Sequence, residues 1–456
     1  MFAKVLVDVA HSNVDRLFTY QLQEDSDIAL GQRVLVPFGA GNRAIEGFVL
    51  ELCNEAPDEV LNIKRIIKAM EPYPALTGEQ ITLAKWISKS YHCLLVEALR
   101  LMIPAQLRGS RVKEKTERIV RLSPDTDPQK AMSSLRKADG SSKAPKQTEV
   151  LELICNMNTA MSVADINGFI PSASQAINAL IKKGILVDDD FVVYRDPFAN
   201  MDTAPTQPLP LTKDQHSALE TINEQIDSGR GTSLLFGVTG SGKTEVYMQA
   251  ISHALSTGGQ AIVLVPEISL TPQAMQRFKS RFGNRVAVLH SRLSYGERFD
   301  EWRRIRLGMV DVVIGARSAV FAPLERVKLI VIDEEHEQSY HSDHTPRYGA
   351  AEVAAKRAEL SNAALVLGSA TPSIAAYRRA LSGRYKLIAL PERVNKSPLP
   401  DVRIVDMRSE FLQGNNSVFS AALTKELARC FDSGEQAILF MNRRGYSTFV
   451  SCRGCG

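Results

Sequence analysis

A glycine-rich segment, GVTGSGKT at residues 237–244, constrains this chain more than any other feature. An apolar run typical of a buried strand precedes it at 232–238, and apolar residues recur at helical spacing through 245–255 after it. Between a strand and a helix, such glycines let backbone N–H groups face a polyphosphate, and the helix adds its positive N-terminal end. The segment predicts a nucleotide phosphate site in which Lys243 reaches the outer phosphates and Thr244 holds Mg²⁺. The residues expected to contact the nucleotide here are Gly237, Val238, Thr239, Gly240, Ser241, Gly242, Lys243 and Thr244.

A second polar cluster, DEEH at residues 333–336, directly follows an apolar strand-like run. Asp333 is placed to hold Mg²⁺, often through water, and Glu334 to orient or deprotonate an attacking water. The alternative is a solvated acidic loop without a ligand. With Lys243, these two acids form the predicted catalytic set of a nucleoside triphosphatase that uses ATP and Mg²⁺.

A third motif, GSATPS at residues 368–373, also ends an apolar run. Small hydroxyl residues at this place can hydrogen-bond the DEEH segment and sense the outermost phosphate. We expect Ser369, Ala370 and Thr371 to couple to hydrolysis, with His336 as the link. The motif alone is weakly specific, and its position after the other two gives it weight.

Strand-like runs alternate with helical stretches around these motifs. This alternation predicts a parallel α/β sheet with ligand groups at the carboxyl ends of its strands. The runs cover residues 260–273, 286–291, 310–323, 328–336 and 363–373.

The preceding residues divide into smaller parts. Short alternating segments predict a β-rich domain over 1–105, with helices in 77–103. A Ser-, Lys- and Gly-rich composition predicts a basic linker at 106–146.

The next part, 147–196, reads as short helices followed by an acidic turn at 188–190 and a strand. This is a winged-helix pattern, which contacts DNA in some proteins and only protein in others. A Pro-rich linker at 197–210 then leads to the main domain.

Composition sets broad limits. The 456 residues are 44% hydrophobic and 23% charged with a net charge of +4, as in a soluble protein of roughly three domains. This mild charge permits nucleic-acid binding without requiring it. No apolar run is long enough to span a bilayer and no signal region opens the chain, so we expect no membrane partner and a cytoplasmic location. Four isolated cysteines predict no disulfide framework: Cys53, Cys93, Cys155 and Cys430.

Taken in order, the motifs resemble those of a superfamily 2 helicase. Their sequences are similar to those of the primosomal protein N′ family of bacterial replication-restart helicases. The similarity covers the whole chain and is most specific over 211–456. The segments that carry the resemblance are GVTGSGKTEVY, LVPEISLTPQ, HS, GARSAVFAP, VIDEEH, GSATPS, ILFMNRRGYS and CRGCG.

The resemblance implies a multidomain α/β fold. A small β-rich domain and a winged-helix domain would precede a P-loop RecA-like helicase lobe at 211–395. The start of a second lobe would occupy 396–451, and the start of a zinc-binding insertion 452–456.

It also implies an ATP-dependent 3′-to-5′ DNA helicase that recognises stalled or collapsed replication forks and initiates primosome assembly. Its partners would be forked DNA, 3′ ends and single strands, with other primosome proteins, a replicative helicase loader and single-stranded DNA-binding protein. The N-terminal domain would hold a nascent 3′ end.

Some DNA-contacting residues follow from the resemblance alone. Phe18 matches an aromatic position of the 3′-end pocket, Thr19 stands where an acid is often found, and Lys64 matches a basic position. Without the resemblance, Phe18 reads as a core aromatic in a strand.

Three further residues match the family's aromatic-rich loop after DEEH, namely Tyr340, Arg347 and Tyr348, which suit base stacking and phosphate contact. Without the resemblance this is a plain surface loop. Gln215 resembles the helicase glutamine that reads adenine through one donor and one acceptor.

The last residues carry one C-x₂-C pair, Cys452 and Cys455. Structural zinc has four ligands, so this Zn²⁺ site is incomplete, and we expect a chain that stops inside the zinc-binding region. Arg443 and Arg444 would begin the second lobe rather than supply its ATP-contacting arginine. We expect such a chain to bind DNA and to hydrolyse ATP poorly.

Two other functions stay open. The chain could be an NTPase subunit of another DNA-translocating machine, or a non-catalytic fragment that binds DNA ends or forks. A preference for a free 3′ hydroxyl end would count against the first of these.

Overall fold

The structure is a computed structural model that describes residues 1–23, 26–55, 63–105, 107–108, 114–137, 141–157, 159–195, 197, 204–398 and 400–440. The chain divides into two compact units, Met1–Lys396 and Ser397–Gly456. Among the described residues, no helix combines the length and apolar character needed to cross a bilayer.

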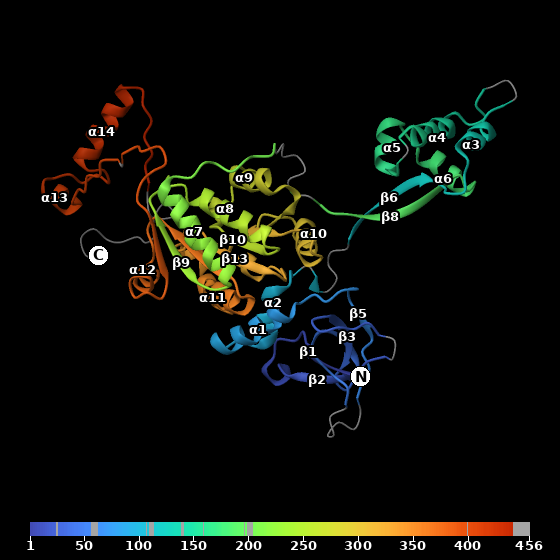
Figure 1. Cartoon of the computed structure of the whole chain (residues 1–456), viewed down its shortest axis with the longest axis horizontal. Coiled ribbons are helices and arrows are strands. Elements are labelled where there is room, and N and C mark those ends of the chain that lie inside the picture. The colour runs from blue at the N-terminus through green and yellow to red at the C-terminus, as the bar shows by residue number, and fades with distance from the viewer. Residues whose placement is uncertain are drawn as a thin grey trace. The chain divides into compact units, whose positions relative to one another are not determined.

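A seven-stranded sheet forms the centre of the first unit (Figure 1). Its order is β11-β12-β10-β13-β14-β9-β15, and every neighbouring pair is parallel, as predicted. The phosphate-loop strand β9 therefore lies beside β14, two places from β13. The strands are β9 (Thr232–Gly237), β10 (Gln260–Leu264), β11 (Val286–Leu289), β12 (Val312–Gly315), β13 (Val327–Ile332), β14 (Ala364–Ser369) and β15 (Lys386–Leu390).

Both faces of this sheet are apolar, as parallel sheets require. Alternate strand residues belong to two different hydrophobic clusters; Leu329 and Val331 face one, and Ile330 and Ile332 the other. The first face is covered by α7 (Lys213–Ser228), α8 (Lys243–Ser256) and α9 (Pro272–Phe282), and the second by α10 (Tyr295–Arg306), α11 (Ala350–Ser361) and α12 (Ile374–Leu381). Short 3₁₀ turns join them: η3 (Glu267–Ser269), η4 (Gly283–Arg285), η5 (Arg317–Phe321) and η6 (Gln338–Tyr340).

The N-terminal domain contains a five-stranded sheet of order β2-β1-β4-β3-β5, whose paired strands are antiparallel. At its base Arg33, fully buried, pairs with Glu46 at 2.7 Å and Glu71 at 2.6 Å and donates to the carbonyl of Leu107. The elements are β1 (Phe2–Val7), η1 (Ser12–Val14), β2 (Leu17–Gln21), β3 (Arg33–Phe38), β4 (Arg43–Cys53) and β5 (Lys68–Ala69).

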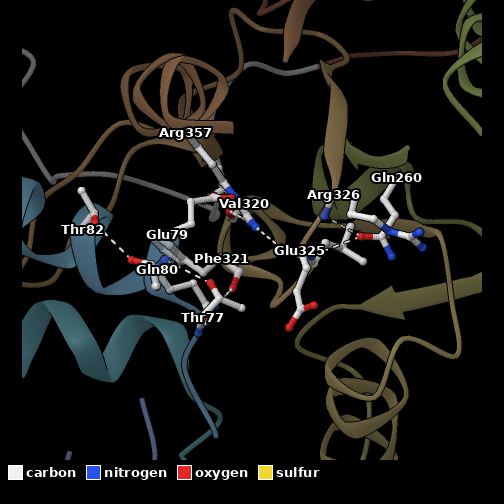
Figure 2. Close-up of polar contacts among 12 residues, drawn as sticks. Thr77, Glu79, Gln80, Thr82, Gln260, Val320, Phe321, Glu325, Arg326 and Arg357 are labelled. Atoms are coloured by element: carbon white, nitrogen blue, oxygen red, sulfur yellow. Dashed lines mark hydrogen bonds and ion pairs between the residues drawn. The ribbon is translucent and has the colours of Figure 1, made fainter. Parts of the chain in front are cut away.

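Helices α1 (Gly78–Ser90) and α2 (Leu95–Met102) join this domain to the large sheet. Figure 2 shows α1 facing α11 and η5: Glu79 pairs with the fully buried Arg357 at 2.7 Å, and Gln80 donates to the Phe321 carbonyl at 2.8 Å. Apolar residues of both helices belong to the same cluster as α10 and α11. The predicted domain boundary after residue 105 therefore does not separate two hydrophobic cores.

The segment predicted as a linker at 106–146 contains regular structure, so that prediction was wrong. Strand β6 (Lys115–Leu122) pairs along its whole length with β8 (Leu186–Val193). The predicted acidic turn at 188–190 instead lies inside β8, where Arg118 bonds Asp188 at 2.6 Å. The domain predicted to be a winged helix also contains α3 (Pro128–Ser134), α4 (Pro145–Met157), β7 (Met161–Ser162), α5 (Val163–Phe169) and α6 (Ser174–Lys182) around its own core.

Residues 204–210 of the second predicted linker pack on the large α/β domain. Glu245 accepts a hydrogen bond from the Leu209 N–H at 3.1 Å and pairs with Arg281, which also donates to the Gln207 carbonyl at 3.2 Å. These contacts attach the segment to α8 just after the phosphate loop.

The second unit contains α13 (Met407–Leu412) and α14 (Ala421–Asp432). The predicted zinc ligands Cys452 and Cys455 lie outside the described residues. Within the described ranges, no group of three or more His, Cys, Asp or Glu side chains is arranged to hold a metal ion.

Candidate nucleotide site

The phosphate loop connects β9 to α8 and requires glycine at two places. Gly240 and Gly242 have φ of +82° and +83°, in the left-handed region that glycine adopts most readily. A Cβ on Gly242 would also lie 2.3 Å from Nε2 of Gln215. The loop is thus built around backbone rather than side chains, as a cradle for phosphate requires.

Two polar side chains in the loop fit an anionic ligand. Lys243 is only 8% exposed, and its ammonium donates to the Gly237 carbonyl at 2.8 Å, which keeps it beside the loop. Ser241 is 2% exposed, and its hydroxyl has no hydrogen-bond partner among the residues that the structure describes. A buried polar atom without a partner is costly unless a ligand satisfies it.

Backbone hydrogen bonds connect the loop to the chain that follows β15. The Val238 N–H donates to the Leu390 carbonyl at 3.3 Å, and the Val394 N–H donates to the Gly240 carbonyl at 3.0 Å. Residues far along the sequence therefore help to hold the loop.

Gln215 lies at the start of α7, buried against the loop. Its Nε2 donates to the Ser241 carbonyl at 2.8 Å, and its Oε1 accepts from the Thr212 N–H at 2.8 Å in a capping box. Both amide atoms are thus engaged within the protein. The structure gives Gln215 a role in supporting the loop, and its predicted contact with adenine stays a prediction.

Asp333 follows β13 at the same edge of the sheet. The pKa of Asp333 is raised to about 6, mainly by burial and then by the charge of Glu334, against the lowering effects of the Lys243 ammonium and a hydrogen bond from Tyr247. Tyr247 of α8, the helix that begins at Lys243, donates to Oδ1 of Asp333 at 3.3 Å. The phosphate loop and the acidic motif, remote in sequence, meet as predicted.

The backbone at Glu334 has φ of +47°, which is uncommon for a residue with a side chain. Such conformations cost roughly 1–3 kcal/mol and persist where the surroundings enforce them. Here the Asp333 carbonyl accepts a hydrogen bond from the Tyr340 hydroxyl at 2.7 Å, and the Glu335 N–H donates to the Gly368 carbonyl at 3.0 Å.

His336 joins the acidic motif to the strand end of β14, as expected. Its Nδ1 lies 2.8 Å from the Ser369 hydroxyl and 3.6 Å from a Glu334 carboxylate oxygen, and its Nε2 lies 3.4 Å from the Thr371 hydroxyl. Ala370 lies between the two hydroxyl residues, half-buried. The predicted role of these contacts in coupling the nucleotide to hydrolysis stays a prediction.

Two site residues escaped the sequence analysis. Glu335 accepts hydrogen bonds from the backbone N–H and hydroxyl of Ser373, at 2.6 and 3.1 Å, and so holds the start of α12. Tyr247 reaches Asp333 from α8. Its position one helical turn after Thr244 is a signal that could have found it.

The tyrosines predicted to stack on DNA are buried, at 3% exposure each, which corrects that prediction. Tyr340 instead bonds the Asp333 carbonyl. Tyr348 packs edge-on against Phe321 at 5.1 Å, with the Arg317 guanidinium over its ring. Arg347 is exposed.

In the N-terminal sheet, Phe18 and Lys64 approach the same turn. Phe18 is half-buried, with Phe38 edge-on at 5.1 Å, and the Lys64 ammonium donates to the Gly39 carbonyl at 2.7 Å. The two residues predicted for a 3′-end pocket therefore converge at Phe38 and Gly39.

The residues at the strand edge fit a magnesium nucleotide. The Thr244 hydroxyl and the Asp333 carboxylate are the oxygen ligands that Mg²⁺ prefers, and the orphaned Ser241 hydroxyl and the glycine cradle suit phosphate. These residues would hold the ion and the nucleotide.

Comparisons with known proteins agree with this arrangement. Residues 4–104 match the 3′DNA-binding domain (3′BD) of PriA, and residues 212–380 match the DEAD/DEAH box helicase family.

The chain is 40% identical to the replication restart protein PriA of Bacillus subtilis (strain 168), over 100% of this chain and 64% of that protein. Its identity to PriA of Synechocystis is 45%, over 68% of this chain and 38% of that protein. For PriA of Chlamydia muridarum the identity is 32%, over 100% of this chain and 60% of that protein. The chain thus spans less than two thirds of the length of each relative. With two domain models matched and PriA proteins aligned along the whole chain, it belongs to the PriA family of replication restart proteins.

Proposed function

We propose that this chain supplies the 3′-end-binding domain and the nucleotide-binding lobe of an ATP-dependent 3′-to-5′ DNA helicase that recognises stalled replication forks and initiates primosome assembly. The observation that carries the proposal is the hydrogen bond from Tyr247 to Asp333, which joins α8, the helix that begins at Lys243, to the acidic motif at one edge of the parallel sheet. The chain also aligns over its whole length with a PriA protein.

The residues divide the work of hydrolysis. Backbone N–H groups of the loop and the Lys243 ammonium would bind and orient the phosphates. Glu334, turned by its left-handed backbone, would hold and deprotonate the attacking water. Thr244 and Asp333 would hold Mg²⁺, which neutralises charge on the phosphates.

DNA contact would involve the N-terminal sheet. An aromatic ring and an ammonium at one turn suit the last base and the backbone of a 3′ end. Phe18 and Lys64 supply this pair, and the matching 3′ DNA-binding domain supports the assignment. Forked and single-stranded DNA, other primosome proteins, a helicase loader and single-stranded DNA-binding protein are the proposed partners.

Steady-state ATP hydrolysis by the 456-residue chain, with and without single-stranded DNA, tests the catalytic part. Lys243→Ala should lower turnover by at least about a hundredfold, because the phosphates lose their ammonium. Lys89→Ala, at an exposed lysine ending α1, is the matched control and should leave turnover unchanged. Fork binding without any nucleotide binding would favour the non-catalytic DNA-binding alternative.

Binding to forks that end in a 3′ hydroxyl or a 3′ phosphate tests the DNA part. We expect tighter binding to the hydroxyl end, and loss of this preference in Lys64→Ala. Equal affinity for both ends in the unmodified chain would refute 3′-end recognition.

A further inference from the structure

Tyr247 lies on α8, one helical turn after Thr244, and is 1% exposed. Its hydroxyl donates to Oδ1 of Asp333 at 3.3 Å. The bond links the helix that follows the phosphate loop to the strand that delivers the acid.

The neighbouring strand leaves room for this hydroxyl. A Cβ on Gly368, the residue before Ser369 in β14, would lie 1.5 Å from the Tyr247 hydroxyl oxygen. It would also lie 2.7 Å from the ring carbon that carries the hydroxyl. Glycine at this position therefore permits the approach of Tyr247 to Asp333, so α8, β13 and β14 are shaped around one hydroxyl group.

A second tyrosine holds a different part of the same residue. Tyr340 bonds the backbone carbonyl of Asp333, whereas Tyr247 bonds its carboxylate. Only the second bond orients the oxygens that would face the cation. Groups that hydrogen-bond a ligating carboxylate fix its direction and raise metal affinity.

We propose that Tyr247 is a positioning residue for the divalent cation of the nucleotide site. Its hydroxyl holds the Asp333 carboxylate in a fixed orientation and ties it to the helix that carries Thr244. This hydrogen bond keeps the two expected cation ligands, Thr244 and Asp333, in fixed positions relative to each other. This role rests on the proposed nucleotide function.

The test is binding of N-methylanthraniloyl-ADP to the full chain, followed by fluorescence in EDTA and across a series of MgCl₂ concentrations. Tyr247→Phe keeps the ring and removes the hydroxyl. We expect its half-saturating Mg²⁺ concentration to rise about tenfold, the scale for a supporting group around a metal ligand, with nucleotide affinity in EDTA within about twofold of the unmodified chain.

Tyr20→Phe is the matched control. Tyr20 is also buried, at 3% exposure, and its hydroxyl also donates over 3.3 Å, but to the carbonyl of Pro37. Its Mg²⁺ dependence should be unchanged. Equal Mg²⁺ dependence in Tyr247→Phe and the unmodified chain would overturn the role, whereas an unmodified chain that binds no nucleotide would overturn the proposed function itself.

Gly368→Ala provides an independent route to the same bond. The added methyl should displace the Tyr247 hydroxyl and weaken Mg²⁺ binding by a similar factor. Because both changes break one hydrogen bond, the double variant should be little worse than Gly368→Ala alone. Fully additive effects would mean that Gly368 does not act through Tyr247.

Discussion

Arg33 in the N-terminal sheet and Arg357 on α11 are both fully buried, but their surroundings differ. Arg33 faces two carboxylates, Glu46 and Glu71, and one carbonyl. Arg357 faces one carboxylate, Glu79, and the carbonyls of Val320 and Leu324 at 2.5 and 3.3 Å.

The difference appears in the protonation of Glu71. The pKa of Glu71 is raised to about 7. Burial is the largest cause, the charge of Arg33 lowers the pKa, and the charge of Glu46 raises it. One arginine does not balance two half-buried carboxylates, and Oε2 of Glu71, which has no partner among the described residues, can take the proton. At Arg357 the charges balance, because one carboxylate pairs with the arginine and two carbonyls accept its remaining hydrogen bonds.

The largest effect is expected for Arg33→Met at pH 8, about 5 kcal/mol of local destabilisation. The change leaves two half-buried carboxylates without their buried arginine, and breaking a buried ion pair costs about 3–5 kcal/mol. The cost should fall at pH 5, where Glu71 carries a proton. Hydrogen exchange in peptides from β3 and β4 measures it, and an equal cost at both pH values would contradict the comparison.

Arg357→Met should cost about 3–4 kcal/mol, because it strands one carboxylate and two carbonyls. Faster hydrogen exchange should appear in both α1 and α11, since the arginine joins them. Arg378→Met, at an exposed position on α12, should change exchange by less than about 0.5 kcal/mol. Unchanged protection of α1 in Arg357→Met would show that the apolar cluster alone holds the helix.

Glu71→Gln should stabilise the N-terminal sheet at pH 8 by roughly 3 kcal/mol, with little effect near pH 4. The pKa of Glu71 in the folded chain, about 7, exceeds its ordinary value of 4.5, so its favourable contribution is complete below pH 4.5 and is lost as the pH rises through 7. The amide retains an acceptor for Arg33 and cannot ionise. Urea unfolding across pH 4–8 measures the free energy of unfolding. If this free energy falls with pH as steeply in the variant as in the unmodified chain, a group other than Glu71 causes the pH dependence.

The smallest effect is expected for Tyr91→Phe, about 0.5–1 kcal/mol. Its hydroxyl donates to Glu352 at 2.5 Å across the same α1–α11 contact, but Glu352 is exposed and water can replace the bond. Hydrogen exchange in α1 compares it with Arg357→Met. An equal loss in both variants would mean that burial does not distinguish these contacts.

The sequence predicted those parts of the fold and site that follow local patterns. Apolar strands alternating with helices predicted the parallel sheet, and the glycine-rich loop and DEEH predicted that Lys243 and Asp333 would meet. The predictions that failed depend on long-range packing. Polar segment 115–122 read as a linker, yet it forms β6 because β8 supplies complementary charges about seventy residues later.

The same reason explains the misassigned side chains. The loop after DEEH was predicted to present exposed stacking rings. Both tyrosines are instead buried: Tyr340 donates to the Asp333 carbonyl, and Tyr348 packs against Phe321. Tyr247 was not identified from the sequence as a site residue. Its partner Asp333 follows β13, and the space at Gly368 lies in β14, both of which come much later in the sequence.

The strand and loop after α12 have a practical consequence for fragments of the lobe. The DEAD/DEAH match ends at residue 380, before β15 begins at Lys386. An expression fragment cut there would turn β9 into an unprotected sheet edge and remove the acceptor at Leu390 and the donor at Val394. A fragment made to test the proposed nucleotide site should therefore extend past Val394, because a shorter fragment would lose contacts that hold the phosphate loop.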